Sequence, residues 1–555
     1  MNCPFNKRTK FLIACAIIGI ALSFSLKAGF CEKPFWKEMW RIGEPLASGI
    51  VVSEVSDGGG EKSRIVLRNI KQQNPYSISA STFQDSPFGL LTAPPQPGYL
   101  LDLGVHWMAT GIRFASWEDI ERKQGVYDFA AVDKKLTYLS RNGINTIIEL
   151  RAINPVYGTR SGKRGFLGYS YPEQHLTEWA RFVEKLVERY DADGFEDAPG
   201  SPRVTEYQLI HELPVPQLRQ GFWRKNPDIY AKFFKVTYDA VRRSCTDCTL
   251  YFVGGFAQDF LFRGEEIRSM EVADEDGFFV KVLNEFREKS IKLKNIGFDY
   301  HFWSFWLFNQ NVTAESYRNH VWFVEKIKKF SKYFGYSDSE IKIISKEAGV
   351  NGYLNKEREQ AIYLLKIYIS AIAAGQKRLF WTSVVEYGHE AKLFLGMGLV
   401  HNPKNNGYSH KKISYYTYQL MADKLKDSDW TNVKSVVNGK DSVYVFKFPQ
   451  KKESKTVYIV WWDYFSEKER ERKDYRFRSD FTSDKITVTC ALPRGKSGLE
   501  IQDMVHFESE IHEIKEGIVA VNLGKEPVYI EEGPIPAPVY RVKRVNPAIL
   551  DTLVD

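Results

Sequence analysis

Between residues 86 and 430, short apolar runs typical of strands alternate with helical segments, and no other feature constrains the fold as strongly. The run at 144–150 is rich in Ile, as expected for a parallel strand buried on both faces. The segment at 175–190 instead repeats its apolar residues at the spacing of an amphipathic helix. Such alternation predicts parallel βα units. Eight strands over roughly 340 residues therefore predict an α/β fold, a closed (β/α)8 TIM barrel with insertions.

The bounds of these elements follow from the apolar runs and from helix start and stop signals. The expected strands lie at 86–90, 109–115, 144–150, up to Glu212, 249–255, 297–302, up to Glu347 and 378–384. The expected helices include 98–107, 175–190, 361–374, 409–426 and the segment that begins at Asn226-Pro227. In that last segment, a capping residue precedes a proline at the first helical position.

After Trp430 the pattern changes to short strand runs separated by turns, at 443–448, 456–462, 485–490 and 528–530. A chain of 555 residues exceeds the size at which one hydrophobic core stops growing, so a second domain is expected. We therefore predict a barrel at 86–430 and an all-β sandwich domain at 431–555. Residues 29–85 are polar and interrupted by glycine, and we interpret them as an N-terminal extension.

The N-terminus has the order of a secretory signal peptide, which we place at 1–28. Three basic residues (Lys7, Arg8 and Lys10) precede an apolar run at 11–26, and small residues follow it. The run is short for a membrane span, which needs about 20 residues. The protein is thus expected to be exported to the periplasm or the exterior. The alternative is retention of this segment as an uncleaved anchor.

Two further features bear on the compartment and on the partners. In an exported protein, Cys245 and Cys248 are placed to form a small loop disulfide. The net charge of +8 comes from interspersed basic and acidic residues, which does not indicate a nucleic-acid partner. No membrane contact is expected beyond the N-terminal segment.

Glu212 and Glu347 each stand where an apolar strand run gives way to a loop. In a closed barrel of βα units, chemistry is located at the carboxyl ends of the strands. Two glutamates at two strand ends can therefore face each other across that opening, although they are far apart in sequence. Paired carboxylates on either side of a sugar bond are what glycoside hydrolysis requires. We expect no metal or cofactor in the reaction, because two carboxylates suffice.

From residue 86 to about 430 the chain resembles the clan A glycoside hydrolases, particularly families 39 and 5. The motifs that carry the resemblance are Gly111-Ile112-Arg113-Phe114, Trp117, Ile120-Glu121, Gly125 to Phe129, Glu212 with Pro214, Phe222-Trp223, His301, Glu347-Ala348-Gly349, Trp381, Gly398-Leu399-Val400 and Tyr415-Tyr416. None of these pieces is specific alone, but they occur in the order of those families. The resemblance implies a retaining enzyme that acts on a poly- or oligosaccharide.

The resemblance also implies roles for individual residues. Glu212 matches the acid/base, which must hold a proton near neutral pH, and Glu347 matches the nucleophile, which must be ionised. Arg113 would supply a cation near Glu347. His301 would hydrogen-bond a sugar hydroxyl or the nucleophile, and Trp381 would present its indole face to the sugar ring. In a retaining enzyme the two carboxyl groups should lie roughly 5–5.5 Å apart.

Two positions depart from the pattern of those families. His211 stands where an Asn usually precedes the acid/base, and Trp303 stands where a Tyr usually lies beside the nucleophile. Because a charged imidazole beside Glu212 would favour loss of the acid's proton, we expect His211 to be neutral in the working enzyme. These departures affect the identity of the substrate more than the class of reaction.

The sequence leaves one alternative of another class open, a non-catalytic carbohydrate-binding protein that retains the barrel. It does not determine the glycan and its linkage, endo or exo action, the oligomeric state or the role of the β domain.

Overall fold

The computed structural model describes about three fifths of the chain. The described residues are 50–51, 68–69, 85–91, 98–111, 114–159, 171–211, 223, 226–254, 278–303, 316–352, 356–387, 396–407, 409–438, 443–451, 455–462, 475–478, 481–494, 501 and 505–535. Side chains are not described for every one of them, and those of Phe302 and Trp303 are among the exceptions.

Eight parallel strands close into a barrel in the order β10-β3-β4-β5-β6-β7-β8-β9. Their bounds are β3 Phe88–Leu91, β4 Trp107–Ala109, β5 Asn145–Leu150, β6 Glu206–Leu209, β7 Thr249–Tyr251, β8 Ile296–Trp303, β9 Ile341–Gly349 and β10 Arg378–Trp381. Each strand after β3 pairs with the one before it, and β10 pairs with β3 to close the ring. The predicted TIM barrel is confirmed.

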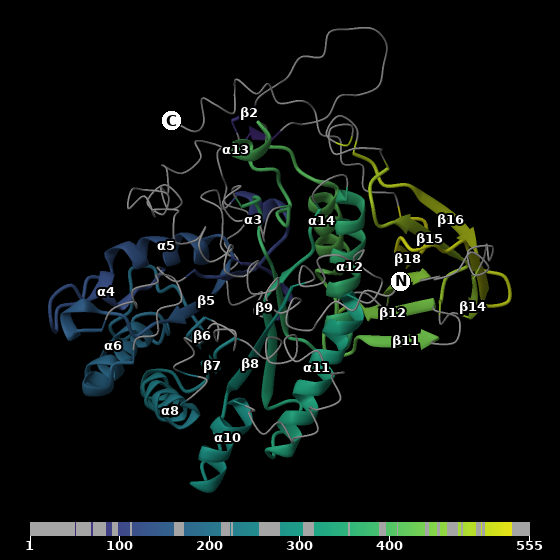
Figure 1. The fold of residues 1–555 in the computed structure, drawn as a ribbon. Coiled ribbons are helices and arrows are strands. Elements are labelled where there is room, and N and C mark those ends of the chain that lie inside the picture. The colour runs from purple at the N-terminus through teal and green to yellow at the C-terminus, as the bar shows by residue number, and fades with distance from the viewer. Residues whose placement is uncertain are drawn as a thin grey trace, which may run out of the picture.

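Helices surround the barrel, and Figure 1 shows them outside the central strands. Their bounds are α3 Gly98–Asp102, α4 Trp117–Ile120, α5 Ala130–Arg141, α6 Leu176–Glu188, α8 Pro227–Ser244, α10 Phe278–Glu288, α11 Ser316–Tyr333, α12 Glu357–Ala373, α13 Pro403–Asn406 and α14 Ile413–Leu425. Two single-turn 3-10 helices, η2 Pro155–Tyr157 and η4 Glu173–His175, lie in the connections. Pro227 occupies the first position of α8, as its sequence predicts.

The expected second strand at 109–115 is wrong, because β4 ends at Ala109. Phe114 and Ala115 lie outside the strand, and the Phe114 amide donates to the Gly111 carbonyl at 3.0 Å. The helix expected at 98–107 is also too long. It ends at Asp102, and Gly104 then takes a φ of 68°, a left-handed conformation that favours glycine. Apolar content alone therefore misplaced the carboxyl ends of β4 and α3.

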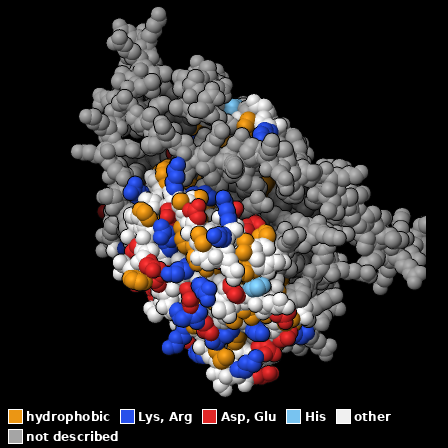
Figure 2. All heavy atoms as spheres, turned by 90° about the vertical axis from the view of Figure 1, so that its left-hand side faces the viewer, with side chains coloured by type: hydrophobic (Ala, Val, Ile, Leu, Met, Phe, Trp, Pro, Cys, Tyr) orange, Lys and Arg blue, Asp and Glu red, His pale blue; other side chains and the backbone are white. Residues whose placement is uncertain are grey.

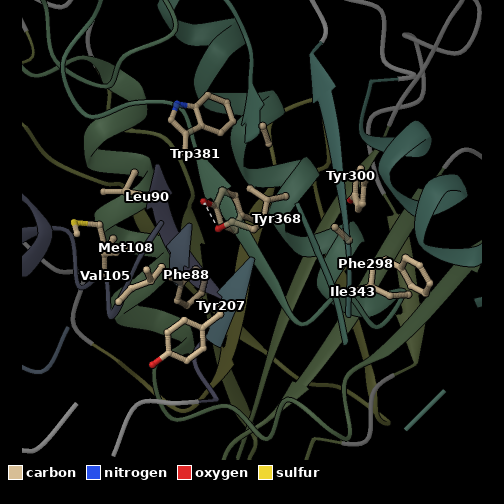
Figure 3. Packing of buried hydrophobic residues seen from close by; sticks show 14 of the residues in the cluster. Phe88, Leu90, Val105, Met108, Tyr207, Phe298, Tyr300, Ile343, Tyr368 and Trp381 are labelled. Carbon is tan, nitrogen blue, oxygen red and sulfur yellow. Dashed lines mark hydrogen bonds between the residues drawn. The ribbon is translucent and has the colours of Figure 1, made fainter. Parts of the chain in front are cut away.

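A layer of apolar side chains fills the space between the barrel strands and the helices. Figure 3 shows part of this layer, including Phe88, Leu90, Tyr207, Phe298 and Tyr368, all of them buried. The Tyr368 hydroxyl donates to the carbonyl oxygen of Gly89 at 3.1 Å, which ties α12 to β3. A second, smaller apolar cluster lies on the other face of the strands, inside the barrel, and consists of Leu91, Trp107, Ala109, Ile147, Tyr251, Ile344 and Phe380.

The C-terminal strands form an all-β domain, as predicted. A six-stranded antiparallel sheet has the order β11-β12-β13-β18-β15-β16, and β14 pairs with β17 in a separate two-stranded sheet. Their bounds are β11 Lys434–Asn438, β12 Val443–Pro449, β13 Thr456–Trp462, β14 Tyr475–Arg478, β15 Lys485–Cys490, β16 Ser509–Glu513, β17 Ile518–Val521 and β18 Val528–Glu532. Side chains of β12, β13, β15 and β18 share an apolar core with Val519 and Val521 of β17. The two sheets thus enclose a core in the manner of a sandwich.

The opposite face of the six-stranded sheet packs on the barrel helices. Figure 1 shows α12 and α14 between the barrel strands and this sheet. Trp461 of β13 stacks on Phe446 of β12 with ring centroids 4.9 Å apart, and the Lys366 Nζ of α12 lies 5.5 Å from the Trp461 ring. Arg358 of α12 forms an ion pair with Glu526. The β domain is therefore held to the barrel by both apolar and ionic contacts.

The N-terminal predictions fall mainly on residues that the structure does not describe. The signal segment at 1–28 lies outside the described residues, and the extension contributes one antiparallel pair, β1 Ile50–Val51 with β2 Arg68–Asn69. Among the described residues, no helix combines the length and apolar character needed to cross a membrane. The predicted disulfide is confirmed, since Cys245 and Cys248 are bonded with their Cα atoms 5.5 Å apart.

The described part of one face carries mixed charge. Figure 2 shows Lys and Arg side chains interspersed with Asp and Glu over the side of the barrel that bears α4, α5, α6 and α8. On the described part of this face, neither sign of charge forms an extended stripe.

Candidate active site

Glu347 lies at the carboxyl end of β9, and three other strand ends bring polar side chains to it. His301 comes from β8, Glu149 from β5, and His211 from the residue pair that follows β6. We call the set Glu149, Gln208, His211, Asp299, His301, Lys346 and Glu347 the mouth cluster. The side chains of this cluster are at most about a tenth exposed. Three of the residues singled out from the sequence, His211, His301 and Glu347, thus lie together at this edge of the barrel, whereas the meeting of Glu212 with Glu347 stays a prediction.

A β-bulge in β9 allows two consecutive residues to point into the barrel. Asp299 of β8 is paired with Ile344, whereas His301 is paired with Glu347, so two steps on β8 match three on β9. Side chains normally alternate between the faces of a strand, and an extra residue resets that alternation. Lys346 and Glu347 can therefore both contact groups of the mouth cluster. The same shift appears between β9 and β10.

The carboxylate of Glu347 is bracketed by two imidazoles. Its Oε1 lies 2.7 Å from His211 Nε2, and its Oε2 lies 3.6 Å from His301 Nδ1. Burial alone would raise the pKa of this carboxyl group. The positive charge that the two histidines can carry, the hydrogen bond with His211 and the nearby Lys346 outweigh burial and lower the pKa of Glu347 to about 2. The group is therefore ionised across the physiological range, as a nucleophile must be.

The backbone before His211 is strained. Ile210 has a φ of 67°, in the left-handed region that β-branched residues avoid. Strain of this kind persists only where the surrounding structure enforces it, and such sites are often functional. Here the conformation turns the chain at the end of β6, and His211 then reaches Glu347. Gly254 makes room beside it, since a Cβ there would lie 2.6 Å from both the His211 carbonyl oxygen and His301 Nε2.

His211 lies between two carboxylates, an arrangement that favours the charged imidazole over the neutral form expected from the sequence. Its Nδ1 is 3.0 Å from Glu149 Oε2, and its Nε2 faces Glu347. Burial and Lys346 disfavour the charged imidazole, but Glu149 and Glu347 outweigh them, and the pKa of His211 is raised. The sequence could not show this, because Glu149 is 62 positions away and lies within a buried strand run.

A second row of buried groups holds these residues in place, and reasoning from the sequence missed it. Lys346 Nζ lies 3.0 Å from Glu149 Oε2 and donates to Gln208 Oε1 at 2.6 Å. The amide of Gln208 donates to Asp299 Oδ2 at 2.7 Å, and Asp299 also lies 2.9 Å from His301 Nε2. One signal could have revealed this row. Charged and amide residues within runs predicted to be buried need polar partners there.

The remaining predicted site residues are only partly described. Glu212 and Arg113 lie outside the described residues, so the separation of the two carboxyl groups stays a prediction. Trp303 has a described backbone in β8 but no described side chain. Trp381 is fully buried, and its indole N–H donates to the Met397 carbonyl at 3.0 Å. Its contact with a sugar ring also stays a prediction.

No protein-family model and no curated protein matches the sequence. Among solved structures, the chain is similar to a family 39 glycoside hydrolase from Bacteroides cellulosilyticus WH2, with a TM-score of 0.53 and 19% identity over 80% of each chain. An α-L-arabinofuranosidase from Thermotoga maritima has a TM-score of 0.49 and 11% identity, over 78% of this chain and 88% of that one. A family 44 xyloglucanase from Paenibacillus polymyxa has a TM-score of 0.48 and 12% identity, over 80% and 96%. The first likeness confirms the fold to which the sequence resemblance points.

Proposed function

We propose that the protein is a retaining glycoside hydrolase in which Glu347 is the nucleophile. The observation that carries this proposal is the position of the Glu347 carboxylate at the carboxyl end of β9, bracketed by His211 and His301. In TIM-barrel enzymes this end of the barrel carries the catalytic residues. A buried, ionised carboxylate that is still about a tenth exposed is suited to attack an electrophilic carbon.

The proposed reaction has two steps. A Glu347 oxygen attacks the anomeric carbon and forms a glycosyl ester, while the glycosidic oxygen leaves with a proton from Glu212. Water then attacks the anomeric carbon, gives a proton to the Glu212 carboxylate and releases Glu347. Glu212 directly follows His211 in the chain. The charge of His211 would favour ionisation of an adjacent carboxyl group, so proton donation by Glu212 requires that another influence keep its pKa high.

The substrate is proposed to be a β-linked poly- or oligosaccharide that an exported enzyme meets outside the cytoplasm. His301 and Trp381 keep the sugar-binding roles that the family resemblance implies, Arg113 is proposed to supply the cation near Glu347, and Trp303 is proposed to contact the substrate in place of the usual Tyr. His211 would add a hydrogen bond to the sugar in place of the usual Asn.

The test is a panel of plant and bacterial glycans incubated with the wild-type protein and assayed for released reducing ends. We expect turnover on at least one glycan and, by NMR, retention of the anomeric configuration in the first product. Glu347→Ala should abolish turnover but leave glycan affinity largely intact, because it removes the attacking group and little contact surface. Glu212→Ala should slow activated aryl glycosides less than natural glycosides, since a good leaving group needs less protonation.

Other outcomes would replace the proposal. An inverted product would remove Glu347 as the nucleophile. Binding of a glycan without hydrolysis by the wild-type protein would instead favour the non-catalytic carbohydrate-binding protein. Detection of the protein in the exterior or periplasmic fraction, with a new N-terminus near residue 28, tests export.

A further inference from the structure

The two histidines beside Glu347 share an arrangement that hydrolysis by two carboxylates does not need. Each presents one ring nitrogen to the Glu347 carboxylate and has a fully buried carboxylate behind the other nitrogen. For His211 that second carboxylate is Glu149 at 3.0 Å, and for His301 it is Asp299 at 2.9 Å. Histidines that bind metal ions characteristically hold their second nitrogen against a carboxylate or a carbonyl group, which fixes the ring and makes the ligand more basic.

The distances between the three facing groups suit a small divalent ion. The ligand atoms of His211, His301 and Glu347 all lie within 4.8 Å of one another. Zn²⁺ binds nitrogen and carboxylate oxygen at about 2.0–2.2 Å, which in a tetrahedron separates neighbouring ligand atoms by about 3.3 Å. The observed separations of 2.7 Å and 3.6 Å lie on either side of that value. The two distances involve different oxygens of Glu347, so this carboxylate presents one oxygen to each histidine, and all three side chains face a common point.

The charge of the surroundings also favours a cation. A histidine must lose its proton to bind a metal ion. In that state, the described groups here comprise three carboxylates, Glu149, Asp299 and Glu347, and two cations, Lys346 and Arg151, so the sum is −1. Two imidazoles and one carboxylate make a ligand set that suits zinc.

We propose that His211, His301 and Glu347 form a binding site for a divalent transition-metal ion of the Zn²⁺ type, which occupies the barrel mouth in the absence of a glycan. Binding of the ion does not depend on the proposed function. Inhibition by the ion does rest on the proposed function, since an ion on Glu347 takes the electron pair that would attack the sugar. Metal and glycan then compete, and the metal inhibits hydrolysis.

The first experiment measures binding without any substrate. The full-length protein, freed of metal with EDTA, is titrated with ZnCl₂ by calorimetry and with CoCl₂ by visible absorption. We expect one ion per chain, and with Co²⁺ the strong d–d bands of a four-coordinate site with nitrogen ligands. His211→Asn should weaken the affinity by more than about 10-fold, because loss of a direct ligand should cost at least as much as loss of an outer-shell partner. Asp299→Asn, which alters only a group behind a ligand, should weaken it by roughly 10–100-fold.

Two control variants distinguish this site from others. His401→Asn alters a histidine that also pairs with a carboxylate, Glu357 at 2.8 Å, outside the mouth cluster. Asp193→Asn alters a second group of residues with metal-ligand spacing, Glu188, Asp191 and Asp193. Both variants should bind as the wild type does. The proposed site would be overturned if the wild type bound no metal, or if His211→Asn bound it with unchanged affinity. Loss of binding in Asp193→Asn would also overturn it, because the metal would then lie at the second group.

The second experiment applies once a glycan substrate is known. Zn²⁺ should inhibit turnover at the concentration at which it binds, and excess EDTA should restore activity. Increasing glycan should raise the apparent dissociation constant of Zn²⁺. Unchanged turnover with the site filled would overturn the competition. An inactive protein that still binds the metal would overturn only the proposed function.

Discussion

The barrel contains two buried groups of charged residues, and their construction differs. The mouth cluster lies at the carboxyl ends of the strands. The other, which we call the base cluster, lies toward their amino ends and consists of Trp107, Glu206, Thr249, Tyr251, Lys342 and Arg378. In the base cluster, Glu206 accepts hydrogen bonds from Arg378 Nη1 at 2.6 Å and from the Tyr251 hydroxyl at 3.0 Å. The guanidinium of Arg378 in turn lies 3.5 Å above the Trp107 ring.

The partners of the key carboxylate distinguish the two clusters. Burial raises the pKa of Glu206, but Arg378 and Lys342 outweigh it, and the pKa is lowered. The guanidinium that pairs with Glu206 cannot release a proton in a protein. Glu347 is paired with imidazoles, which gain and lose protons near neutral pH. The Glu206 carboxylate has a partner whose charge does not change with pH, which suits a structural role. The Glu347 carboxylate has partners that can exchange protons near neutral pH, which suits a catalytic role.

The largest expected difference concerns turnover on a substrate found in the glycan panel. Glu347→Ala should lower kcat by roughly 10³-fold or more, since it removes the group that forms the covalent bond. Glu206→Gln, matched in burial but at the opposite end of the strands, should change kcat by less than about 10-fold. Steady-state kinetics of the two variants check this. Equal losses in both would mean that Glu347 acts only through folding.

The next prediction concerns Lys346 of the mouth cluster, for which Lys342 of the base cluster, four residues earlier on β9, serves as the control. Lys346→Met should lower the free energy of unfolding by about 3–5 kcal/mol, because it removes a fully buried ammonium group from the buried Glu149 carboxylate. Urea denaturation measures the change. A loss of less than about 1 kcal/mol would show that Arg151 and His211 suffice to hold Glu149.

The dependence of stability on pH should also identify the mouth cluster. His211 has a raised pKa, so its contribution is fully present below about pH 6.5 and is lost as pH rises through the folded-state pKa. Glu347, whose pKa is lowered to about 2, contributes fully above about pH 4.5 and loses that contribution as pH falls toward 2.

Variants separate these two contributions. The stability difference between wild type and His211→Asn should shrink as pH rises above about 6.5, by at most about 1.4 kcal/mol per pH unit. The difference between wild type and Glu347→Gln should shrink as pH falls below about 4.5. Denaturation curves at several pH values test both. Parallel pH profiles for wild type and His211→Asn would show that His211 has an ordinary pKa in the folded protein.

The smallest expected effect belongs to Lys342 in the base cluster. Its side chain is 36% exposed, and its Nζ lies 3.5 Å from Glu206 Oε1, which already has Arg378. Lys342→Met should therefore cost no more than about 1 kcal/mol. It is the matched control for Lys346→Met in the same urea series. A loss as large as that of Lys346→Met would mean that burial does not distinguish the two clusters.

The architecture could be predicted from local patterns. The alternation of strand and helix periods predicted the closed barrel, and the change after Trp430 predicted the β domain. Strand ends were less accurate, as the stretch from Gly111 to Phe114 shows, because an apolar run does not reveal where the chain turns. The position of Glu347 at the end of a strand could be predicted because hydrophobic content falls there.

The state of that glutamate was decided by the tertiary structure. The bulge that lets Lys346 and Glu347 both point inward depends on the register of β9 against β8 and β10, which no local pattern encodes. His211 is charged more readily than an ordinary histidine because Glu149, on the neighbouring strand β5, lies behind it. The sequence by itself therefore determined which side chains stand at the strand ends. Only the closed barrel decided which of them lie side by side. The protonation state of each group depends on this, because the electrostatic energy between two charges depends on their separation.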